Sequence, residues 1–529
     1  MSTNEAVSEI NQEWKPSVSP WLISGAVMLS TFMVVLDSSV ANVALPHMAG
    51  TFSASSTEIT WILTSYLIAT GIILPSTAWF SSLFGRKNFL IICIIIFTLA
   101  SILCGMSTSL NMMVFARILQ GLGGGALIPI SQSILLESFP IEKRGVSMAV
   151  FGLGVVLAPV IGPTLGGWIT DNFSWNWIFY INVPIGILAV YLSHMFVEDP
   201  PYLKRGTIQK IDYVGFITLI VWLVSLQIVL DNGQNSDWFG SAWVCWTSLL
   251  SAVSMIFFFV WELHFKDSII DLGAFKDRNF AVGTILSTLV NAILYSTLAI
   301  LPLFLQSLLG YTAYHSGIAI TPRGLGCLSV IVLAGYLSNK VDNRFQIIFG
   351  FILLAISCFM FGNLNLNISM TNIIFPNVIC GMALGFLFIP LATLSFATLS
   401  KEHIANATGI QNLLKNIGGG IGISIVGTML SRNAQIHQAN MVSHLSQLNP
   451  VFQHKITLLN HFLSMHMSPA VAAHKANFFM YVTLLKQSVL WSYIDNFRLY
   501  GLISLILIPT VFIFKNTKAD KNENNAVIH

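Results

Sequence analysis

The feature that most constrains this chain is a series of fourteen apolar stretches, each long enough to cross a lipid bilayer. A helix that spans the hydrocarbon layer needs about 20 apolar residues. The predicted spans are 21–44, 58–80, 88–107, 112–136, 146–169, 177–197, 213–230, 241–261, 280–304, 316–338, 345–363, 371–398, 405–429 and 493–514. The boundaries are soft, and 12 or 13 spans would result if a weak stretch failed to cross.

Lysine and arginine are sorted by side. Loops after the even-numbered spans hold them, and loops after the first six odd-numbered spans hold none. The basic loop residues are Arg86, Lys87, Lys143, Arg144, Lys204, Arg205, Lys210, Lys266, Lys276, Arg278, Lys340, Arg344 and Lys401. Because positively charged loops stay in the cytoplasm, this sorting predicts that both chain ends face the cytoplasm.

Composition supports a membrane protein. Charged residues make up 9% of the chain, against roughly 25% in a soluble domain, and the mean hydropathy is +0.75. The net charge of +3 comes from the loops and predicts no nucleic-acid partner. The six cysteines lie in apolar segments without paired spacing, so neither a disulfide framework nor a zinc site is expected.

Two segments 257 positions apart resemble each other and indicate two related halves. Residues 78–87 and 335–344 each close a span with a small residue, a serine and a terminal base. The predicted organisation is an all-α membrane protein with two six-helix halves and an inserted two-helix hairpin. Its parts are an N-terminal cytoplasmic tail (1–20), the first half (21–197), a linker with the hairpin (198–279), the second half (280–514) and a C-terminal tail (515–529).

A long segment, 430–492, separates spans 13 and 14 and is expected outside the cytoplasm. It holds six of the twelve histidines, and the apolar spacing over 450–467 predicts one or two amphipathic helices. This segment would be either a docking surface for another protein or a solvent-exposed loop, and both interpretations remain open. The histidine spacing of seven separates two rings by two helical turns, which disfavours metal binding.

Two charges within the spans are candidates for a functional pair. Asp37 is the one acid deep inside a predicted span, where a carboxylate costs about 2.5–3.5 kcal/mol. Arg117 in span 4 lies at a similar depth, roughly 10 Å below the outer mouth. A pair is therefore geometrically allowed, and protonating Asp37 would break it. The alternative is a static pair that fixes helix packing.

Span 5 carries a run of glycines and prolines that predicts close helix contact and bending. The residues of this motif are Gly152, Pro159, Gly162, Pro163, Gly166 and Gly167. Two further buried charges in the second half, Arg323 and Lys415, have no evident carboxylate partner and are candidate charges of a substrate cavity. Counted with Asp37 and Arg117, they make the cavity lean positive, which favours neutral or weakly anionic substrates.

On these residues the chain resembles the major facilitator superfamily, in particular its 14-helix drug:proton antiporter group of the EmrB/QacA type. The resemblance rests on the segment from Asp37 to Pro46, on Arg117 to Gly121, on the span 5 motif, and on residues 175–186 and 301–311. It implies alternating access, proton coupling through Asp37 and Arg117, and a cytoplasmic gate loop at Gly85, Arg86 and Lys87.

The chain departs from that group at several positions. The usual acid of the gate loop is missing where Ala78 and Ser82 stand, Asn176 replaces a common arginine, and Lys415 stands where the group has arginine. The gate loop is therefore expected to use other partners.

These observations predict a proton-coupled multidrug exporter of hydrophobic compounds in a bacterial inner membrane. It would use the proton gradient rather than a cofactor, and by analogy a periplasmic adaptor and an outer-membrane channel would assist it. No motif for a catalytic site or ATP binding is present, so an enzyme is not expected. The alternatives are a transporter of one metabolite on the same fold and a non-transporting receptor or assembly protein.

Overall fold

The computed structural model describes residues 16–55, 57–139, 144–199, 212–265, 272–399, 401–446 and 448–515, and these residues form helices and no strand. Thirteen segments within them are long and apolar enough to cross a membrane, and α7 adds one further long helix to the bundle. The first half consists of α2 (Pro20–Phe52), α3 (Trp61–Phe84), α4 (Arg86–Gly105), α5 (Leu110–Gly124), α6 (Leu127–Ser138), α7 (Arg144–Asn172), α8 (Trp177–Tyr180) and α9 (Asn182–Phe196).

The inserted hairpin consists of α10 (Tyr213–Asn232) and α11 (Ala242–His264), joined by two short turns, η3 (Gln234–Ser236) and η4 (Trp238–Gly240). The second half consists of α12 (Arg278–Leu303), the π-helical turn η6 (Phe304–Leu308), α13 (Ala313–Ile320), α14 (Pro322–Lys340), α15 (Asn343–Phe361), α16 (Thr371–Phe396), α17 (Lys401–Val442), α18 (Pro450–Ser464) and α19 (Pro469–Leu507).

Two predicted spans are split in the structure, each for a local reason. Span 4 breaks between α5 and α6, where glycine, a poor helix former, lets the chain approach α3. A Cβ at Gly125 would lie 2.8 Å from the carbonyl oxygen of Thr70 on α3. Span 10 breaks between α13 and α14, where Pro322 begins the second helix.

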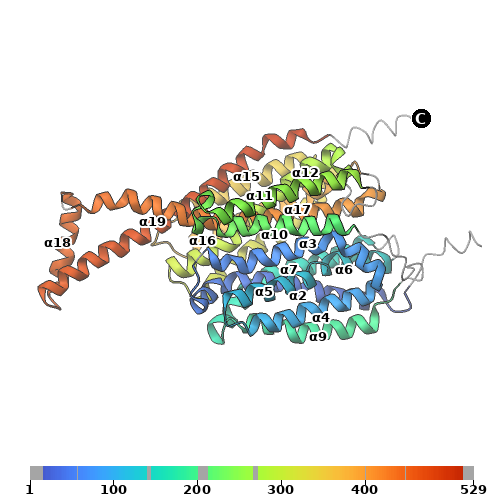
Figure 1. Ribbon diagram of the computed structural model, residues 1–529, viewed down its shortest axis with the longest axis horizontal. Helices are drawn as coiled ribbons and strands as arrows, with labels where there is room; N and C mark the ends of the chain where they lie inside the picture. Colours follow the sequence, from blue (N-terminus) through green and yellow to red (C-terminus); the bar gives the residue numbers. More distant parts are fainter. Residues whose placement is uncertain are drawn as a thin grey trace, which may run out of the picture.

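The helices lie roughly side by side in one bundle, and a helical arm projects from one end (Figure 1). We call the arm the stalk; it consists of α18 and the projecting ends of α17 and α19. The end of the bundle that bears it is the stalk end, and the end where α2 begins is the opposite end. The two halves meet where α7 packs on α13 and α14, α2 on α12, and α3 on α17. Hairpin helix α10 packs against both α3 and α17.

The predicted long loop between spans 13 and 14 is largely a continuation of the flanking helices. Helix α17 runs to Val442, thirteen residues beyond the predicted end of span 13, and α19 begins at Pro469, well before the predicted start of span 14. Amphipathic helix α18 lies between them, over the segment where the apolar spacing predicts a helix. The expectation of helices in 430–492 is therefore correct, but the flanking spans were predicted too short.

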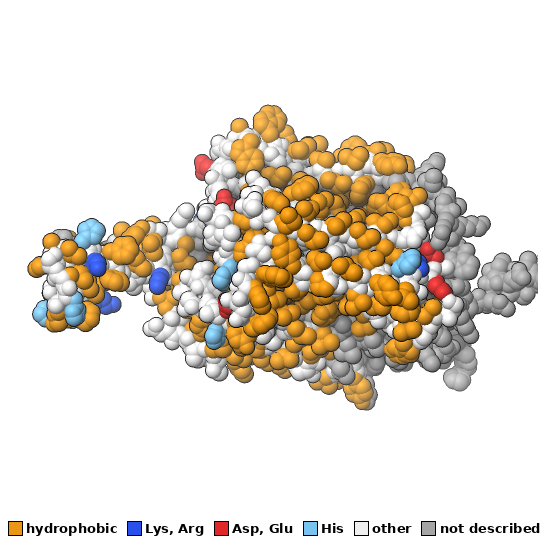
Figure 2. All heavy atoms as spheres, turned by 90° about the horizontal axis from the view of Figure 1, so that it is seen from below, with side chains coloured by type: hydrophobic (Ala, Val, Ile, Leu, Met, Phe, Trp, Pro, Cys, Tyr) orange, Lys and Arg blue, Asp and Glu red, His pale blue; other side chains and the backbone are white. Residues whose placement is uncertain are grey.

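The surface of the bundle suits a lipid environment. Figure 2 shows hydrophobic side chains over the flank of the bundle, with the visible charged side chains near its ends and on the stalk. Helix α11 is the clearest case, since residues such as Trp246, Ile256 and Leu263 are exposed along its length. Buried apolar side chains from both halves form one continuous core.

Several predicted features lie outside the described residues. They are the tail segments 1–15 and 516–529, and the basic residues Lys143, Lys204, Arg205, Lys210 and Lys266. The domain boundaries stay a prediction.

Candidate functional site

The centre of the first half holds a buried ion pair. Arg117 Nη1 lies 2.5 Å from Asp37 Oδ2, and the two side chains are 0% and 1% exposed. The other carboxylate oxygen, Oδ1, accepts hydrogen bonds from Gln120 Nε2 at 2.9 Å and from Asn182 Nδ2 at 2.7 Å. Ser101 Oγ in turn accepts from both amides. The carboxylate is thus held by one cation and two amides, from α5 and α9.

Arg117 has further partners that fix its position. Its Nε donates to the carbonyl oxygen of Ile62 at 3.1 Å, and its Nη1 also donates to Gln120 Oε1 at 2.6 Å. The guanidinium carbon lies 4.4 Å from the centre of the Tyr66 ring, a cation–π distance. Gln120 follows Arg117 by three residues on α5, so both side chains share one helix face.

Disrupting such a cluster should have a large effect on the free energy of unfolding. Removing one member of a buried ion pair typically costs about 3–5 kcal/mol because the remaining charge is left without compensation. A change in the protonation of Asp37 would act on the same interaction. The cluster lies wholly within the first half, on α2, α3, α4, α5 and α9, and not at the contact between the halves.

Helix α7 connects this region to the second half through its glycines. A Cβ at Gly162 would lie 2.6 Å from Ser39 Cβ, and a Cβ at Gly166 would lie 2.6 Å from Val40 Cγ1. Ser39 and Val40 follow Asp37 on α2, so these glycines let α7 approach the helix of the buried acid.

The next glycine of the motif faces the second half. A Cβ at Gly167 would lie 2.3 Å from the carbonyl oxygen of Ala313 on α13. From the other side, a Cβ at Gly317 would lie 2.1 Å from the carbonyl oxygen of Pro163. Helix α7 is therefore packed against α2 on one face and α13 on another, with backbone contact on the α13 face. Pro159 lies within α7 on its exposed side. Gly152 also lies in α7, but its surroundings are outside the described residues.

Polar contacts reinforce the junction between the halves. Thr164 Oγ1 and Thr321 Oγ1 lie 2.7 Å apart. The carboxylate of Asp171, near the end of α7, accepts hydrogen bonds from the backbone N–H groups of Ala313 and Tyr314 at the start of α13. A carboxylate at a helix N-terminus satisfies free N–H groups and interacts favourably with the helix dipole. These contacts hold the two halves together at the stalk end.

The gate loop after span 2 has an acidic partner that the sequence did not reveal. Asp199 Oδ1 accepts from the backbone N–H of Lys87 at 2.8 Å, at the start of α4. Gly85 has φ +79°, and a Cβ there would lie 2.5 Å from Asp199 Oδ2, so both its conformation and its contact require glycine. Lys87 Nζ donates to the carbonyl oxygen of His194 at 2.6 Å. Arg86 is the first residue of α4. The loop is thus fixed to the end of α9 within the same half.

A neighbouring contact ties the chain before α2 to the same place. Both the backbone N–H and the hydroxyl of Ser17 donate to the Glu198 carboxylate. These hydrogen bonds favour the ionised form and hold the pKa of Glu198 below its ordinary value of 4.5.

The two candidate cavity charges lie apart from the ion pair, with partners of their own. Arg323 is 5% exposed, and it donates to Asn377 Oδ1 and Thr297 Oγ1, both at 3.1 Å. Lys415 is partly buried and donates to Gln411 Oε1 at 3.1 Å. Both residues belong to the second half, and so do their hydrogen-bond partners.

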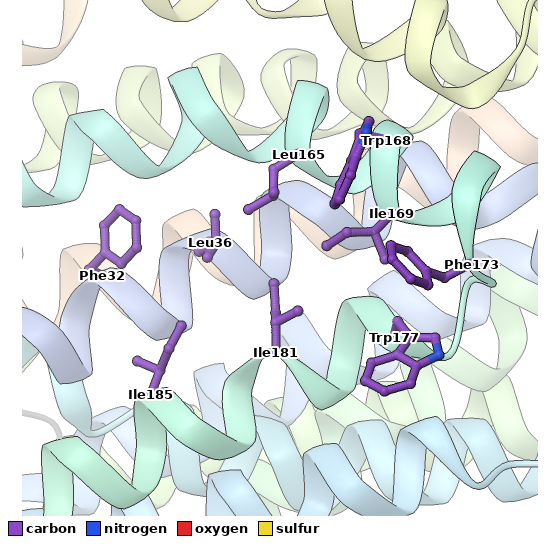
Figure 3. A pocket seen from close by; sticks show the side chains of 9 residues that line it. All are labelled: Phe32, Leu36, Leu165, Trp168, Ile169, Phe173, Trp177, Ile181 and Ile185. Atoms are coloured by element: carbon purple, nitrogen blue, oxygen red, sulfur yellow. The ribbon is translucent and has the colours of Figure 1, made fainter.

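An apolar hollow of about 440 Å³ lies beside α2, the helix of Asp37, on the flank of the first half (Figure 3). It is lined by Phe32, Leu36, Leu165, Trp168, Ile169, Phe173, Trp177, Ile181 and Ile185. Leu36 precedes Asp37 and Leu165 precedes Gly166, so the hollow adjoins the contact between α2 and α7. Its wholly apolar lining suits hydrocarbon rather than a charged compound.

Sequence reasoning missed two acids near the ends of the hairpin helices. Asp231 lies in α10 and Glu262 in α11, because both helices extend beyond the predicted ends of spans 7 and 8. Sequence reasoning also missed Gln120, Asn182 and Ser101 around Asp37. The three-residue spacing from Arg117 could have indicated Gln120, whereas the other two come from distant helices.

A family model described as "Major Facilitator Superfamily" matches residues 27–423. The chain belongs to this superfamily, and it is therefore a transporter. This confirms the family, the fold class and the exclusion of an enzyme that the sequence led us to expect.

Three relatives illustrate the similarity. "Probable multidrug resistance protein EmrY" of Escherichia coli (strain K12) is 36% identical over 434 residues, which cover 82% of this chain and 84% of that protein. "Multidrug export protein EmrB" of the same strain is 36% identical over 443 residues, covering 83% and 86%. "Fatty acid resistance protein FarB" of Neisseria gonorrhoeae is 36% identical over 420 residues, covering 79% and 82%.

Solved structures of transporters share the fold. A POT family transporter in complex with a thioalcohol conjugated peptide has a TM-score of 0.62 at 14% identity, covering 92% of this chain and 96% of that chain. A bacterial homolog to the human lysosomal transporter Spinster, in an inward-facing and unoccupied conformation, has a TM-score of 0.61 at 18% identity, covering 94% and 98%. At these identities the likeness concerns the fold.

Proposed function

We propose that this protein is a multidrug efflux transporter that exports hydrophobic compounds in exchange for protons, by alternating access of its two halves. The observation that carries the proton coupling is the Asp37–Arg117 pair, an ionisable carboxylate buried at 1% exposure on the helix that α7 links to the second half. The export of drugs rests on the similarity to relatives named for multidrug export and resistance.

The coupling follows a physical path through the first half. When Asp37 takes up a proton, Arg117 loses its counter-charge and keeps only the neutral acceptors Gln120 Oε1 and the Ile62 carbonyl oxygen. The resulting rearrangement of α2 acts on α7 at Ser39 and Val40, which contact Gly162 and Gly166. Because another face of α7 abuts α13 in backbone contact, a shift of α7 changes the junction between the halves.

The orientation follows from the charges. The basic loop residues Arg86, Lys87 and Arg278 lie at the ends of helices opposite the stalk. By the positive-inside rule that end faces the cytoplasm, and the stalk end is extracytoplasmic. The protein would then be a multi-pass protein of a bacterial inner membrane, with both termini in the cytoplasm.

The stalk is the proposed contact for a periplasmic adaptor that leads to an outer-membrane channel. It projects beyond the bundle (Figure 1). It also exposes large apolar side chains such as Leu448, Val451, Phe462, Met465 and Phe478. Leu448 alone is 93% exposed. Apolar groups exposed on such a projection, rather than on the lipid-facing flank, are typical of a protein–protein contact.

The substrates are proposed to be small hydrophobic molecules that are neutral or weakly anionic. Arg117 is compensated by Asp37, whereas Arg323 and Lys415 donate hydrogen bonds to neutral side chains. The second half therefore offers positive charge and would disfavour a lipophilic cation. The proton gradient supplies the energy, and the proposal requires no bound cofactor.

The test uses purified protein in liposomes with an imposed pH gradient and a fluorescent hydrophobic compound. The wild type should move the compound against its gradient, and collapse of the pH gradient should stop this. Asp37→Asn should insert normally but lose gradient-driven transport. Asp237→Asn is the matched control, because it removes an exposed carboxyl from the turn of the hairpin.

Gradient-driven transport by Asp37→Asn at the wild-type rate would remove Asp37 from the coupling. Transport of one defined metabolite, with no drug moved, would indicate a dedicated transporter on this fold. If neither protons nor any compound moved, the protein would be a receptor or assembly protein.

A further inference from the structure

The inserted hairpin carries a carboxylate that the mechanism above does not use. Asp231 is the next-to-last residue of α10, at the extracytoplasmic end of the bundle, and it is partly buried. Helix α10 packs there against α3 of the first half and α17 of the second. The carboxylate therefore lies where three parts of the protein meet.

Each oxygen of Asp231 is bonded to a different half. Oδ2 accepts a hydrogen bond from Thr64 Oγ1 on α3 at 3.0 Å. Oδ1 accepts from Ser424 Oγ on α17 and, at 2.8 Å, from Gln227 Nε2 on its own helix. Gln227 Nε2 also donates to Ser424 Oγ, which strengthens the bond to the second half. One side chain of the hairpin thus bridges both halves.

Its surroundings contain hydroxyl and amide donors but no close charge on the packed helices. Helix α3 carries no charged residue. On α17, Lys415 and Arg432 are nine and eight residues from Ser424, or roughly 13 and 12 Å along the helix axis. On α11, Glu262 and His264 lie at the opposite end. Hydrogen bonds to an ionised carboxylate in such a setting are stronger than those between neutral groups.

The position of the bridge is significant for alternating access. Helices α3 and α17 form one of the contacts between the halves, and Thr64 and Ser424 lie near its extracytoplasmic end. Opening that end to the outside requires α3 and α17 to separate or slide there. This movement must change the hydrogen bond from Thr64 to Asp231, the one from Ser424 to Asp231, or both. A passive insertion would not need a carboxylate bonded to both moving parts.

We propose that Asp231 is a positioning residue that fastens the inserted hairpin to both halves and stabilises closure of the extracytoplasmic end, so that the hairpin takes part in the transport cycle. This inference builds on the alternating access proposed above, but its test does not require transport. Failure of the test would leave the proton-coupled export proposal standing.

The test measures closure of this end directly, by cross-linking two engineered cysteines. A Cβ at Gly427 would lie 3.7 Å from Thr57 Cγ2 and 4.0 Å from Thr57 Cα. Thr57→Cys with Gly427→Cys therefore places two thiols within disulfide reach, between the turn that leads into α3 and helix α17. Gly427 lies about one turn beyond Ser424 on α17, and neither substituted residue takes part in the hydrogen bonds of the bridge. The background carries Cys245→Ser, because Cys245 is the exposed native thiol among the described residues.

In membrane vesicles, Asp231→Ala should cross-link roughly tenfold more slowly than the background, the factor expected when a hydrogen bond to a charged group is lost. The control Asp237→Asn removes the charge of an exposed acid of the same hairpin, and asparagine tolerates the left-handed backbone of this residue (φ 56°), so it should cross-link at the background rate. Thr64→Val and Ser424→Ala each remove one bond and should each slow the reaction. In the Asp231→Ala background, Thr64→Val should have no further effect, because the shared contact is already absent.

A background rate in Asp231→Ala would overturn the proposal. If Asp231→Ala did not reach the membrane, the two hydroxyl variants would decide, and background rates in both would overturn it equally. An additive effect of Thr64→Val on top of Asp231→Ala would also contradict it, because Thr64 would then act through another contact.

Discussion

Replacing Asp37 by asparagine is the most direct perturbation of the buried ion pair. Asparagine has nearly the shape of aspartate but one acceptor oxygen in place of two. Either its amide group faces Arg117 Nη1, or it faces the amides of Gln120 and Asn182, which donate to Oδ1 in the wild type. Each orientation places donor against donor, and each leaves the guanidinium without its counter-charge.

The magnitude can be worked from the contacts that remain. Breaking a buried ion pair costs about 3–5 kcal/mol, and Arg117 keeps Gln120 Oε1 and the Ile62 carbonyl oxygen as acceptors. We therefore expect the lower limit, about 3 kcal/mol of lost unfolding free energy. Arg117→Met should cost a similar amount, because it leaves the carboxylate buried with only amide donors. The double variant removes both charges and should cost about 3 kcal/mol or less, rather than the additive value of about 6 kcal/mol.

The assay is a double-mutant cycle on the purified protein, with the free energy of unfolding measured by titration with a denaturing detergent in mixed micelles. The quantity of interest is the coupling energy between the two positions. If the effects of Asp37→Asn and Arg117→Met add to within about 0.5 kcal/mol, the two side chains do not act as a pair, and the coupling scheme loses its basis.

Three further predictions concern neighbouring parts. Gly167→Ala should impair export, because its Cβ would lie 2.3 Å from the Ala313 carbonyl oxygen and force α7 away from α13. The control is Gly25→Ala, whose Cβ would have no heavy atom within 4 Å. Equal efflux in the two variants would contradict this packing argument. Arg117→Lys should transport at a rate between those of the wild type and Arg117→Ala, because lysine keeps the charge but cannot reproduce the hydrogen bonds from both Nε and Nη1. Equal losses of efflux in Arg117→Lys and Arg117→Ala would argue against a role for the charge. The contact between Ser17 and Glu198 should be complete at neutral pH and be lost as the pH falls through the lowered pKa of Glu198. Ser17→Ala should raise that pKa toward 4.5 in an NMR titration of carboxyl-labelled protein. An unchanged pKa would show that Ser17 does not stabilise the carboxylate.

Much of the fold could be predicted from sequence because the bilayer imposes simple rules. Apolar length identifies a span, and the sorting of basic residues identifies a side, without knowledge of neighbouring helices. The pairing of Asp37 with Arg117 was likewise accessible, since a charge in hydrocarbon needs a partner and few were available. Helix ends were harder to predict from the sequence, because polar residues can continue a helix beyond the membrane, as in α17, which runs to Val442.

The missed residues share one cause. Asn182 and Ser101 contribute to the Asp37 cluster from α9 and α4, and Asp199 reaches the gate loop from beyond α9. No local pattern marks a serine or an amide as the partner of a residue 80 or more positions away. Asp231 was missed because it lies just beyond the predicted end of its span, although its carboxylate contacts two other helices.

The sequence alone therefore determined that this chain spans a membrane many times, that its basic residues gather in alternate loops, and that one acid and one arginine within it are candidates for a pair. Those results follow from the transfer of single residues between water and lipid, which depends on residue type and position in a segment. The tertiary structure alone decided which faces of α7 meet α2 and α13, and that Asp231 joins the hairpin to both halves. These depend on how helices rotate and pack against one another, because that packing is set by many weak contacts between residues far apart in the chain.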